Sequence, residues 1–275
     1  MTKATWYFDF ISPFAYLQLA RFPQLPADLE VTPVPVVFGA LLKHWGQLGP
    51  AEIPPKRRFV YRQFKWNADQ LGIPFLMPPR HPFNPLPALR LCVAAGGQID
   101  HVRSVFDVVY GQGLQPDAPD GIQAMAQALG ISDPEVAISS QSVKDVLHSN
   151  TESAIAAGVF GVQTFVAGGE VFWGGDATEM FLSFLQDPSL FETAEMKRIS
   201  EMPMGLIRPK RRRVVDGARR SVFCGDRQIP ITARFHRLNF TTWSGTSTPG
   251  RLRGSGTGSP TDMWTGITPA QIGNA

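Results

Sequence analysis

Cysteine is scarce in this 275-residue chain, which holds only Cys92 and Cys224. The two lie far apart in the sequence and form no Cys-x-x-Cys motif, which argues against a disulfide framework and against a dithiol redox site. We expect Cys92 to be a buried apolar thiol. The histidines show no metal-ligand spacing, which argues against a zinc site.

Long apolar runs are also missing. None approaches the roughly 18 residues that a membrane-spanning helix needs. The segment Met1–Phe10 lacks the basic start, apolar middle and small-residue cleavage site of a secretory signal. We therefore expect a cytoplasmic protein with no membrane partner.

Acidic side chains become rare after residue 207. Residues 208–275 carry 12 basic and 3 acidic side chains, whereas residues 1–207 carry 14 basic and 20 acidic ones, so the net charge of +3 combines two unlike segments. The composition predicts that 208–275 is a basic, weakly ordered tail. The tail lacks regularly spaced stacking aromatics, and we expect no nucleic-acid partner.

The sequence of the first 38 residues predicts a strand, a helix and a second strand. Ala4–Phe10 is an apolar and aromatic run typical of a strand covered on both faces. Ser12 and the proline after it predict a helix start, and the helical spacing runs to Phe22. Val31–Phe38 predicts a second strand, whose two prolines favour the edge of a sheet.

The rest of the periodic sequence divides into a helical part and a hairpin. Residues 39–158 predict helices, interrupted by a proline-rich loop at Pro74–Pro87. Thr164–Ala167 and Glu170–Trp173 flank a Gly-Gly pair and predict a hairpin, followed by a helix. The order predicts an α/β protein with a thioredoxin-like fold (1–38 and 159–200) and an inserted all-helical domain (39–158), the arrangement also seen in DsbA-like oxidoreductases.

The chemistry is expected at the start of the first helix. Redox enzymes of this fold carry a reactive cysteine there, because helix N-terminal amides stabilise a thiolate. Here that place holds Ser12, which can donate a hydrogen bond to a thiolate supplied by another molecule. The alternative interpretation is that Ser12 only caps the helix.

The segments WYFDFISPFAYL, HPFNPLPALRL and GVFGVQTFVAGGEVFWGGDATEMF, within about residues 4–200, resemble 2-hydroxychromene-2-carboxylate isomerases and the related kappa-class glutathione transferases. The resemblance implies a glutathione cofactor, a small aromatic substrate from aromatic-hydrocarbon catabolism, and a homodimer. It implies that glutathione is bound by residues in four segments, namely Ser12, Lys56, Val162 with Gln163, and Gly175 with Asp176. It places Phe14 and Asn84 on the substrate side.

Each of these assignments has a structural alternative. Lys56 stands in a basic run that is typical of a solvated helix face. Asp176 is placed to cap the next helix, with Glu179 as its capping-box partner. Asn84 fits an ordinary loop residue.

One residue departs from the family pattern. The family has a cis-proline before the first hairpin strand, and this chain has Gln163. A cis bond before a non-proline residue costs about 2.5–4 kcal/mol, so we expect either a strained loop or a trans bond that displaces the backbone. On this ground we expect weaker glutathione binding than in a Gln163→Pro variant.

The resemblance implies interconversion of 2-hydroxychromene-2-carboxylate and trans-o-hydroxybenzylidenepyruvate, with no redox change. Thiolate addition makes the conjugated double bond single, rotation follows, and elimination returns the thiol. Two alternatives stay open: a kappa-like glutathione transferase, which consumes glutathione, and a non-catalytic thioredoxin-like binding protein.

Overall fold

The computed structural model describes residues 2–206, and the tail predicted for 208–275 lies outside the described residues. Its centre is a four-stranded sheet of order β2-β1-β3-β4. Strand β1 (Thr2–Phe8) pairs in parallel with β2 (Leu29–Pro35) and antiparallel with β3 (Thr164–Ala167), which pairs antiparallel with β4 (Glu170–Trp173). The edge position of the proline-containing strand and both hairpin strands are as predicted.

Strand β1 is covered on both faces, as its composition predicts. Trp6 and Phe8 are fully buried on one face, where their rings stack with centroids 4.7 Å apart. Tyr7 points to the opposite face and belongs to a smaller cluster with Val36 and Leu41. Alternating side chains of one strand therefore contribute to two apolar cores.

Two predicted strand ends were wrong. Strand β1 ends at Phe8, two residues early, because Asp9 turns the chain out of the sheet and its carbonyl oxygen accepts the Ser12 N–H at 3.0 Å. The second strand was predicted to reach Phe38, which instead begins helix α2. The Phe38 N–H donates to the Asp9 carboxylate at 2.9 Å.

Helix α1 (Pro13–Leu19) follows β1 and ends three residues before the predicted Phe22. Pro23 explains the difference, since it has no N–H to donate to the Leu19 carbonyl and its ring clashes there. The chain continues as the short 3₁₀ helix η1 (Phe22–Gln24).

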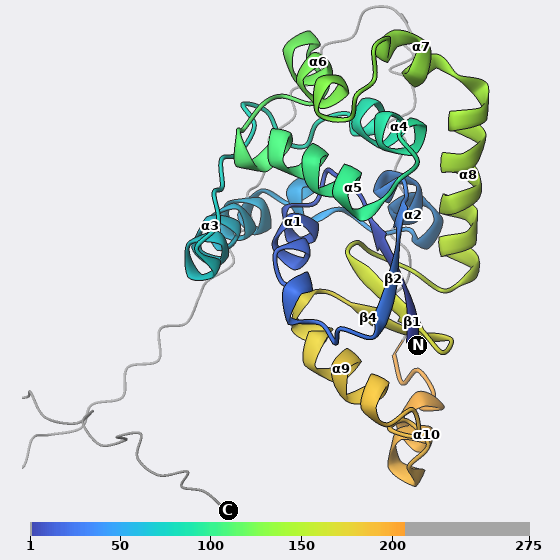
Figure 1. Cartoon of the computed structure of the whole chain (residues 1–275). Helices are drawn as coiled ribbons and strands as arrows, with labels where there is room; N and C mark the ends of the chain where they lie inside the picture. The colour runs from blue at the N-terminus through green and yellow to red at the C-terminus, as the bar shows by residue number, and fades with distance from the viewer. Residues whose placement is uncertain (1, 207–275) are drawn as a thin grey trace, which may run out of the picture. The chain divides into compact units, whose positions relative to one another are not determined.

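The region predicted to be helical, 39–158, consists of helices joined by short loops and one long one, with no strand. Figure 1 shows α4 to α7 in green at one end of the described region and α9 and α10 at the other. A contiguous apolar core joins the sheet to the insert through contacts such as Phe10 against Phe106, with centroids 4.7 Å apart. The helical segments are α2 (Phe38–Trp45), η2 (Pro50–Glu52), α3 (Pro54–Leu71), α4 (Leu86–Ala94), α5 (Ile99–Phe106), the π-helical turn η3 (Asp107–Gly111), α6 (Pro119–Ala128), α7 (Pro134–Ser139) and α8 (Gln141–Ala156).

After the hairpin the chain forms η4 (Gly175–Ala177), α9 (Thr178–Gln186) and α10 (Ala194–Ser200). Helix α9 packs its buried Phe181 ring against Phe165 of β3 in a stacked pair with centroids 4.6 Å apart. Within residues 2–206, no helix is long and apolar enough to cross a membrane.

Candidate functional site

Ser12 lies immediately before helix α1 and is 8% exposed. Its backbone is extended (φ −100°, ψ 106°), as expected of an N-cap residue, but its side chain accepts no capping hydrogen bond. The hydroxyl has no hydrogen-bond partner among residues 2–206. The capping interpretation therefore does not account for this side chain.

A buried carboxylate holds the turn that carries Ser12. Asp9 is 0% exposed and accepts hydrogen bonds from Ile11 N at 3.0 Å and Phe38 N at 2.9 Å. Burial raises the pKa of Asp9 to about 7, and the two N–H donors act in the opposite direction. The side chain thereby joins the Ser12 turn to the start of α2.

His81 braces the same turn from the proline-rich loop. Its Nε2 lies 2.7 Å from the Ile11 carbonyl oxygen, which can only accept, so Nε2 carries a proton and donates it. Tyr61 Oη of α3 lies 2.7 Å from both Nδ1 and the carbonyl oxygen of His81. Burial lowers the pKa of His81, which favours the neutral ring.

A cavity of about 470 Å³ lies along α1 beside this turn. On one side it is lined by Phe14, Gln18 and Arg21, which follow one another at helical spacing from the first turn of α1. Gln63 and Asn67, one turn apart on α3, line the opposite side. The volume is within the range of about 300–1,000 Å³ that is typical of small-molecule sites.

The hairpin and the turn after it close the cavity. It is lined by Val162 before β3, by Trp173 at the end of β4, and by Gly175 and Asp176 in the 3₁₀ turn that follows. Trp173 is 51% exposed and gives the cavity an aromatic wall. The structure thus places together Phe14 and three of the residues that the family resemblance assigns to glutathione.

Gln163 does not line this cavity. The Val162–Gln163 peptide bond is cis, which decides between the two geometries expected from the sequence. The side chain is 1% exposed and occupied by hydrogen bonds to Trp6 and Gln18. The side chain is therefore not available to a ligand, and the Gln163 carbonyl oxygen accepts the Gly174 N–H at 3.0 Å.

Helices α1 and α3 run in the same direction. The Phe14 ring packs edge-on against Phe64 with centroids 4.6 Å apart. Farther along both helices, Tyr16 Oη donates to the carbonyl oxygen of Pro74, just past the end of α3, at 2.8 Å. The first turn of α3 therefore projects beyond the N-terminal end of α1.

Lys56 lies on that first turn and is exposed. It precedes Gln63 by seven residues, or two helical turns, so both are on the same face of α3. Lys56 does not line the cavity.

Asp176 does not cap α9, so the predicted capping box is wrong. Helix α9 begins at Thr178 with Ala177 as its N-cap and has no side-chain cap. Asp176 lies instead in the preceding 3₁₀ turn, because Gly174, with φ +88°, directs the chain into a separate short helix. The Asp176 carboxylate forms no ion pair among residues 2–206.

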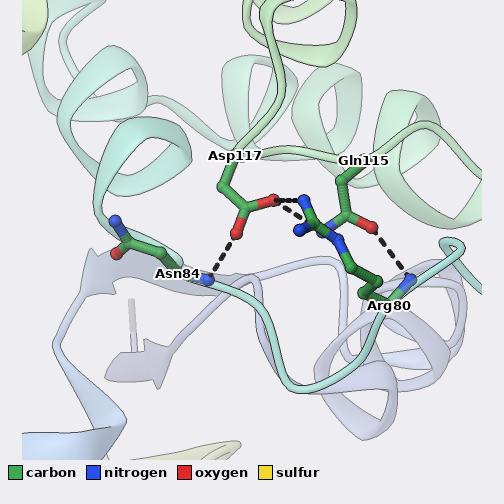
Figure 2. Close-up of polar contacts among 4 residues, drawn as sticks. All are labelled: Arg80, Asn84, Gln115 and Asp117. Carbon is green, nitrogen blue, oxygen red and sulfur yellow. Dashed lines mark hydrogen bonds and ion pairs between the residues drawn. The ribbon is translucent and has the colours of Figure 1, made fainter.

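Asn84 is held in the insert and does not line the cavity. Its backbone N–H donates to Asp117 Oδ2 at 3.0 Å, and Arg80 and Gln115 hold the other carboxylate oxygen (Figure 2). Its side-chain oxygen accepts the Leu86 N–H at 3.1 Å at the start of α4. These contacts give Asn84 a structural role in the loop.

Sequence reasoning missed seven cavity residues: Leu17, Gln18, Arg21, Gln63, Asn67, Trp173 and Gly174. A signal was present for Gln18, which lies four residues after Phe14 on the same face of α1, whereas Arg21 lies beyond the end of that helix. Nothing in the sequence indicated that α3 would face α1.

Other reactive groups lie elsewhere. Cys92 is fully buried, as expected, and burial raises the pKa of its thiol to about 12. In the described part of the chain no cluster of histidine, cysteine or carboxylate side chains is arranged to hold a metal ion.

Comparison with known proteins places this geometry in context. The model of the DSBA-like thioredoxin domain matches residues 5–186. The 2-hydroxychromene-2-carboxylate isomerase of Pseudomonas putida is 30% identical over 186 residues, covering 65% of this chain and 91% of that protein. Glutathione S-transferase kappa 2 of Caenorhabditis elegans is 23% identical over 206 residues, covering 66% of this chain and 91% of that protein.

Solved structures give the same relationship. A 2-hydroxychromene-2-carboxylate isomerase superposes with a TM-score of 0.59 at 25% identity, covering 70% of this chain and 98% of that one. A probable DsbA oxidoreductase from Streptomyces coelicolor superposes with a TM-score of 0.51 at 16% identity, covering 75% and 94% of the two chains, and shows the fold alone.

Proposed function

Because this chain belongs to the DSBA-like thioredoxin domain family, and within it to the 2-hydroxychromene-2-carboxylate isomerase family, we propose that it is a glutathione-dependent cis–trans isomerase. The proposed reaction interconverts 2-hydroxychromene-2-carboxylate and trans-o-hydroxybenzylidenepyruvate. The proposed cofactor is a thiol because the chain offers none of its own at the site, where Ser12 occupies the position of a catalytic cysteine.

The observation that carries the proposal is the Ser12 hydroxyl. It lies at the start of α1 next to Phe14, which lines the cavity, and it is engaged by no other described group. A hydroxyl in this position is able to donate a hydrogen bond to a sulfur anion. The relatives named as isomerases supply the reaction class.

The residues around the cavity fit a tripeptide with charged ends. The residues that line the cavity include one carboxylate, Asp176, and one guanidinium, Arg21. Asp176 is suited to the γ-glutamyl ammonium group, and Lys56 to the glycine carboxylate. The backbone of Val162 and Gly175 is suited to the peptide groups between them.

When bound, glutathione supplies a thiolate that adds reversibly to the conjugated double bond of the substrate, and the resulting single bond rotates before the thiol is eliminated. Ser12 holds the negative charge at the start of α1. Phe14 and Trp173 cover the cavity and reduce the access of water. Asp9 and His81 fix the turn on which Ser12 lies.

Replacement of Ser12 by alanine tests the proposal. A hydrogen bond to a charged group contributes about 1.5–3 kcal/mol, so Ser12→Ala should lower turnover roughly 10- to 150-fold with the fold intact. Turnover is followed by absorbance with the chromene acid, with and without glutathione. Ser183→Ala is the matched control, because that hydroxyl only contacts its own helix, at the Glu179 carbonyl. Unchanged turnover in Ser12→Ala would contradict the proposal.

A kappa-like transferase is the second candidate, and the kappa-class relative favours it. The two activities differ in the fate of glutathione. An isomerase returns the thiol at every turn, whereas a transferase consumes one thiol for each product. Measurement of free thiol during turnover separates them, and a failure of millimolar glutathione to bind would favour a non-catalytic binding protein.

A further inference from the structure

The His81 ring makes polar contacts through both of its nitrogens. Its Nε2 lies 2.7 Å from the carbonyl oxygen of Ile11, so Nε2 carries a proton and donates it. Tyr61 Oη lies 2.7 Å from Nδ1 of the ring and 2.7 Å from the carbonyl oxygen of His81 itself. One tyrosine hydroxyl therefore faces two groups of the same histidine.

These contacts are complete only when the ring is an imidazolium. The Tyr61 hydroxyl has a single proton to donate. With a neutral ring, Nδ1 and the carbonyl oxygen of His81 are both acceptors, so one of the two contacts with Tyr61 has no proton between its atoms. With a second proton on Nδ1, His81 donates to Tyr61 Oη, and Tyr61 donates to the carbonyl oxygen. Each contact then joins a donor to an acceptor.

The surroundings of His81 both oppose and favour this charge. Burial lowers the pKa of His81, which favours the neutral ring in the free chain. Ionisation of Asp9, which accepts the Ile11 N–H, favours a cation on the ring, and the positive charge of Arg57 opposes it. The titratable or charged groups on the elements around His81 are Tyr61 and Arg57 of α3, Tyr110 of η3, Asp9 of the Ser12 turn, and the loop-side ion pair of Arg80 with Asp117.

The ring lies one peptide group away from Ser12. The carbonyl oxygen that accepts from His81 belongs to the peptide group that joins Ile11 to Ser12. His81 does not line the cavity, so it acts on a ligand through this peptide group and through its charge, without contact. A nearby opposite charge favours the charged form of a titrating group by roughly 1–3 pKa units. An anion held at Ser12 would therefore favour the second proton on the ring.

We propose that His81 is a positioning residue that takes up a second proton when a thiolate binds at Ser12, and that Tyr61 holds the ring where this proton is hydrogen-bonded. The identity of the anion as a thiolate rests on the function proposed above. The proton comes from the solution, binds Nδ1, and returns to the solution when the thiolate leaves. His81 thereby balances the charge at the Ser12 turn without touching the ligand.

The coupling between the ring and the sulfur acts in both directions. If a bound thiolate raises the pKa of His81, the protonated ring must lower the pKa of the bound thiol by the same amount, because the two protonation equilibria are linked. A side chain that only braces the turn has no such effect. The pKa of the thiol therefore distinguishes a charge-balancing residue from a structural one.

Nuclear magnetic resonance titration of the full chain measures the pKa of His81, whose ring resonance is identified by sequential assignment. The chain is titrated with saturating glutathione and with saturating S-methylglutathione, which has the same charged ends but cannot form a thiolate. We expect the titration midpoint of His81 to be higher with glutathione by at least about 0.5 pH unit. Both ligands are compared on one protein, so the contributions of Asp9 and Arg57 cancel.

His81→Gln tests the same charge from the side of the ligand. A glutamine amide keeps an N–H donor for the Ile11 carbonyl oxygen but cannot bind a second proton. Ultraviolet absorbance of the thiolate gives the pKa of the bound thiol. We expect this pKa to be higher in His81→Gln, by the amount that glutathione raises the pKa of His81 in the unmodified chain. His148→Gln, which alters an exposed histidine on α8, is the control and should leave the thiol pKa unchanged.

Tyr61→Phe tests the hydrogen bonds without any ligand. Phenylalanine keeps an aromatic ring against Phe64 and removes the hydroxyl. The imidazolium then loses two hydrogen-bonded contacts and the neutral ring loses one, so the pKa of His81 in the free chain should fall by at least about 0.5 unit. Tyr16→Phe, whose hydroxyl donates to the Pro74 carbonyl oxygen at 2.8 Å, is the matched control and should leave the pKa of His81 unchanged.

The outcomes separate the inference from the proposed function. If glutathione does not bind, the proposed function fails and the proton uptake fails with it. If glutathione binds but His81 titrates at the same pH with glutathione and with S-methylglutathione, the charge coupling alone is overturned. A pKa of His81 that is unchanged or higher in Tyr61→Phe would overturn the role of Tyr61. A thermal melt establishes that each variant is folded, and the comparison of the two ligands on the unmodified chain decides the coupling if His81→Gln is not.

Discussion

Ionisation of Asp9 should make the stability of this protein fall as the pH rises. The carboxyl group is fully buried beneath the Ser12 turn, and burial raises its pKa from 3.8 to about 7. In the unfolded chain the same group ionises near 3.8. The folded state therefore binds the proton more tightly, and its contribution to stability is fully present below pH 3.8 and is lost as the pH rises through about 7.

The magnitude follows from the two pKa values. A difference of roughly 3 pKa units at 1.36 kcal/mol each corresponds to about 4 kcal/mol in total. Roughly 2–3 kcal/mol of this is lost between pH 5 and pH 8, because part of the unfolded-state ionisation is already complete at pH 5. Other titrating groups add their own slopes, so a comparison with a variant is needed.

Asp9→Asn isolates this group. The amide cannot ionise and offers one acceptor oxygen in place of two, which leaves either Ile11 N or Phe38 N unsatisfied and costs about 1–3 kcal/mol. Between pH 5 and pH 8 we expect the difference in stability between the variant and the unmodified chain to move in favour of the variant by roughly 2–3 kcal/mol.

Urea unfolding at several pH values between 5 and 8 measures both free energies. Asp28→Asn, which alters an exposed carboxylate, is the control and should give a curve parallel to that of the unmodified chain. If Asp9→Asn also gave a parallel curve, the carboxyl group would be ionised at the same pH in both states. The account of Asp9 as a buried, proton-binding brace of the Ser12 turn would then be refuted.

Two further predictions concern the walls of the site. Lys56→Ala should weaken glutathione binding up to about fivefold at low salt and less at high salt, because an exposed ion pair contributes about 0–1 kcal/mol. Calorimetry measures the affinities, Lys65→Ala on the same helix is the control, and equal losses of affinity in the two variants would contradict the prediction. Gly161→Ala places a Cβ in steric overlap with Trp173 Nε1, so the exposed indole must move, which should change the tryptophan fluorescence and weaken glutathione binding. Gly39→Ala, where nothing lies within 4 Å of the added Cβ, should do neither.

The fold was predictable because its signals are local. The apolar run of β1, the Gly-Gly hairpin and the proline after Ser12 each specify their own conformation, and the order of elements then restricts the topology. The errors have local causes too. Asp9 ends β1 through a hydrogen bond to the Ser12 turn, and the 3₁₀ turn that follows Gly174 holds Asp176 outside α9.

The site was predictable only where the family resemblance covers it. Val162 and Gly175 do line the cavity next to Phe14, but composition and spacing alone give no reason to choose them. Gln63 and Asn67 depend on the packing of α3 along α1, which is set by contacts between distant residues such as Phe14 and Phe64. Such contacts have no signature in a single sequence.

The Gln163 side chain makes hydrogen bonds to Trp6 and Gln18 that could not be read from the sequence. From the sequence it is a missing proline, and the expectation that Gln163→Pro would bind glutathione more tightly stays a prediction. Its side chain supplies the opposing argument, because the Gln163 amide fixes the orientation of Gln18. A proline has no donor to offer Gln18 Oε1, so Gln18, which lines the cavity, would keep only the hydrogen bond from Thr178. Weaker binding of glutathione by Gln163→Pro, measured by calorimetry, would show that the side-chain contact with Gln18 outweighs the backbone preference at this position.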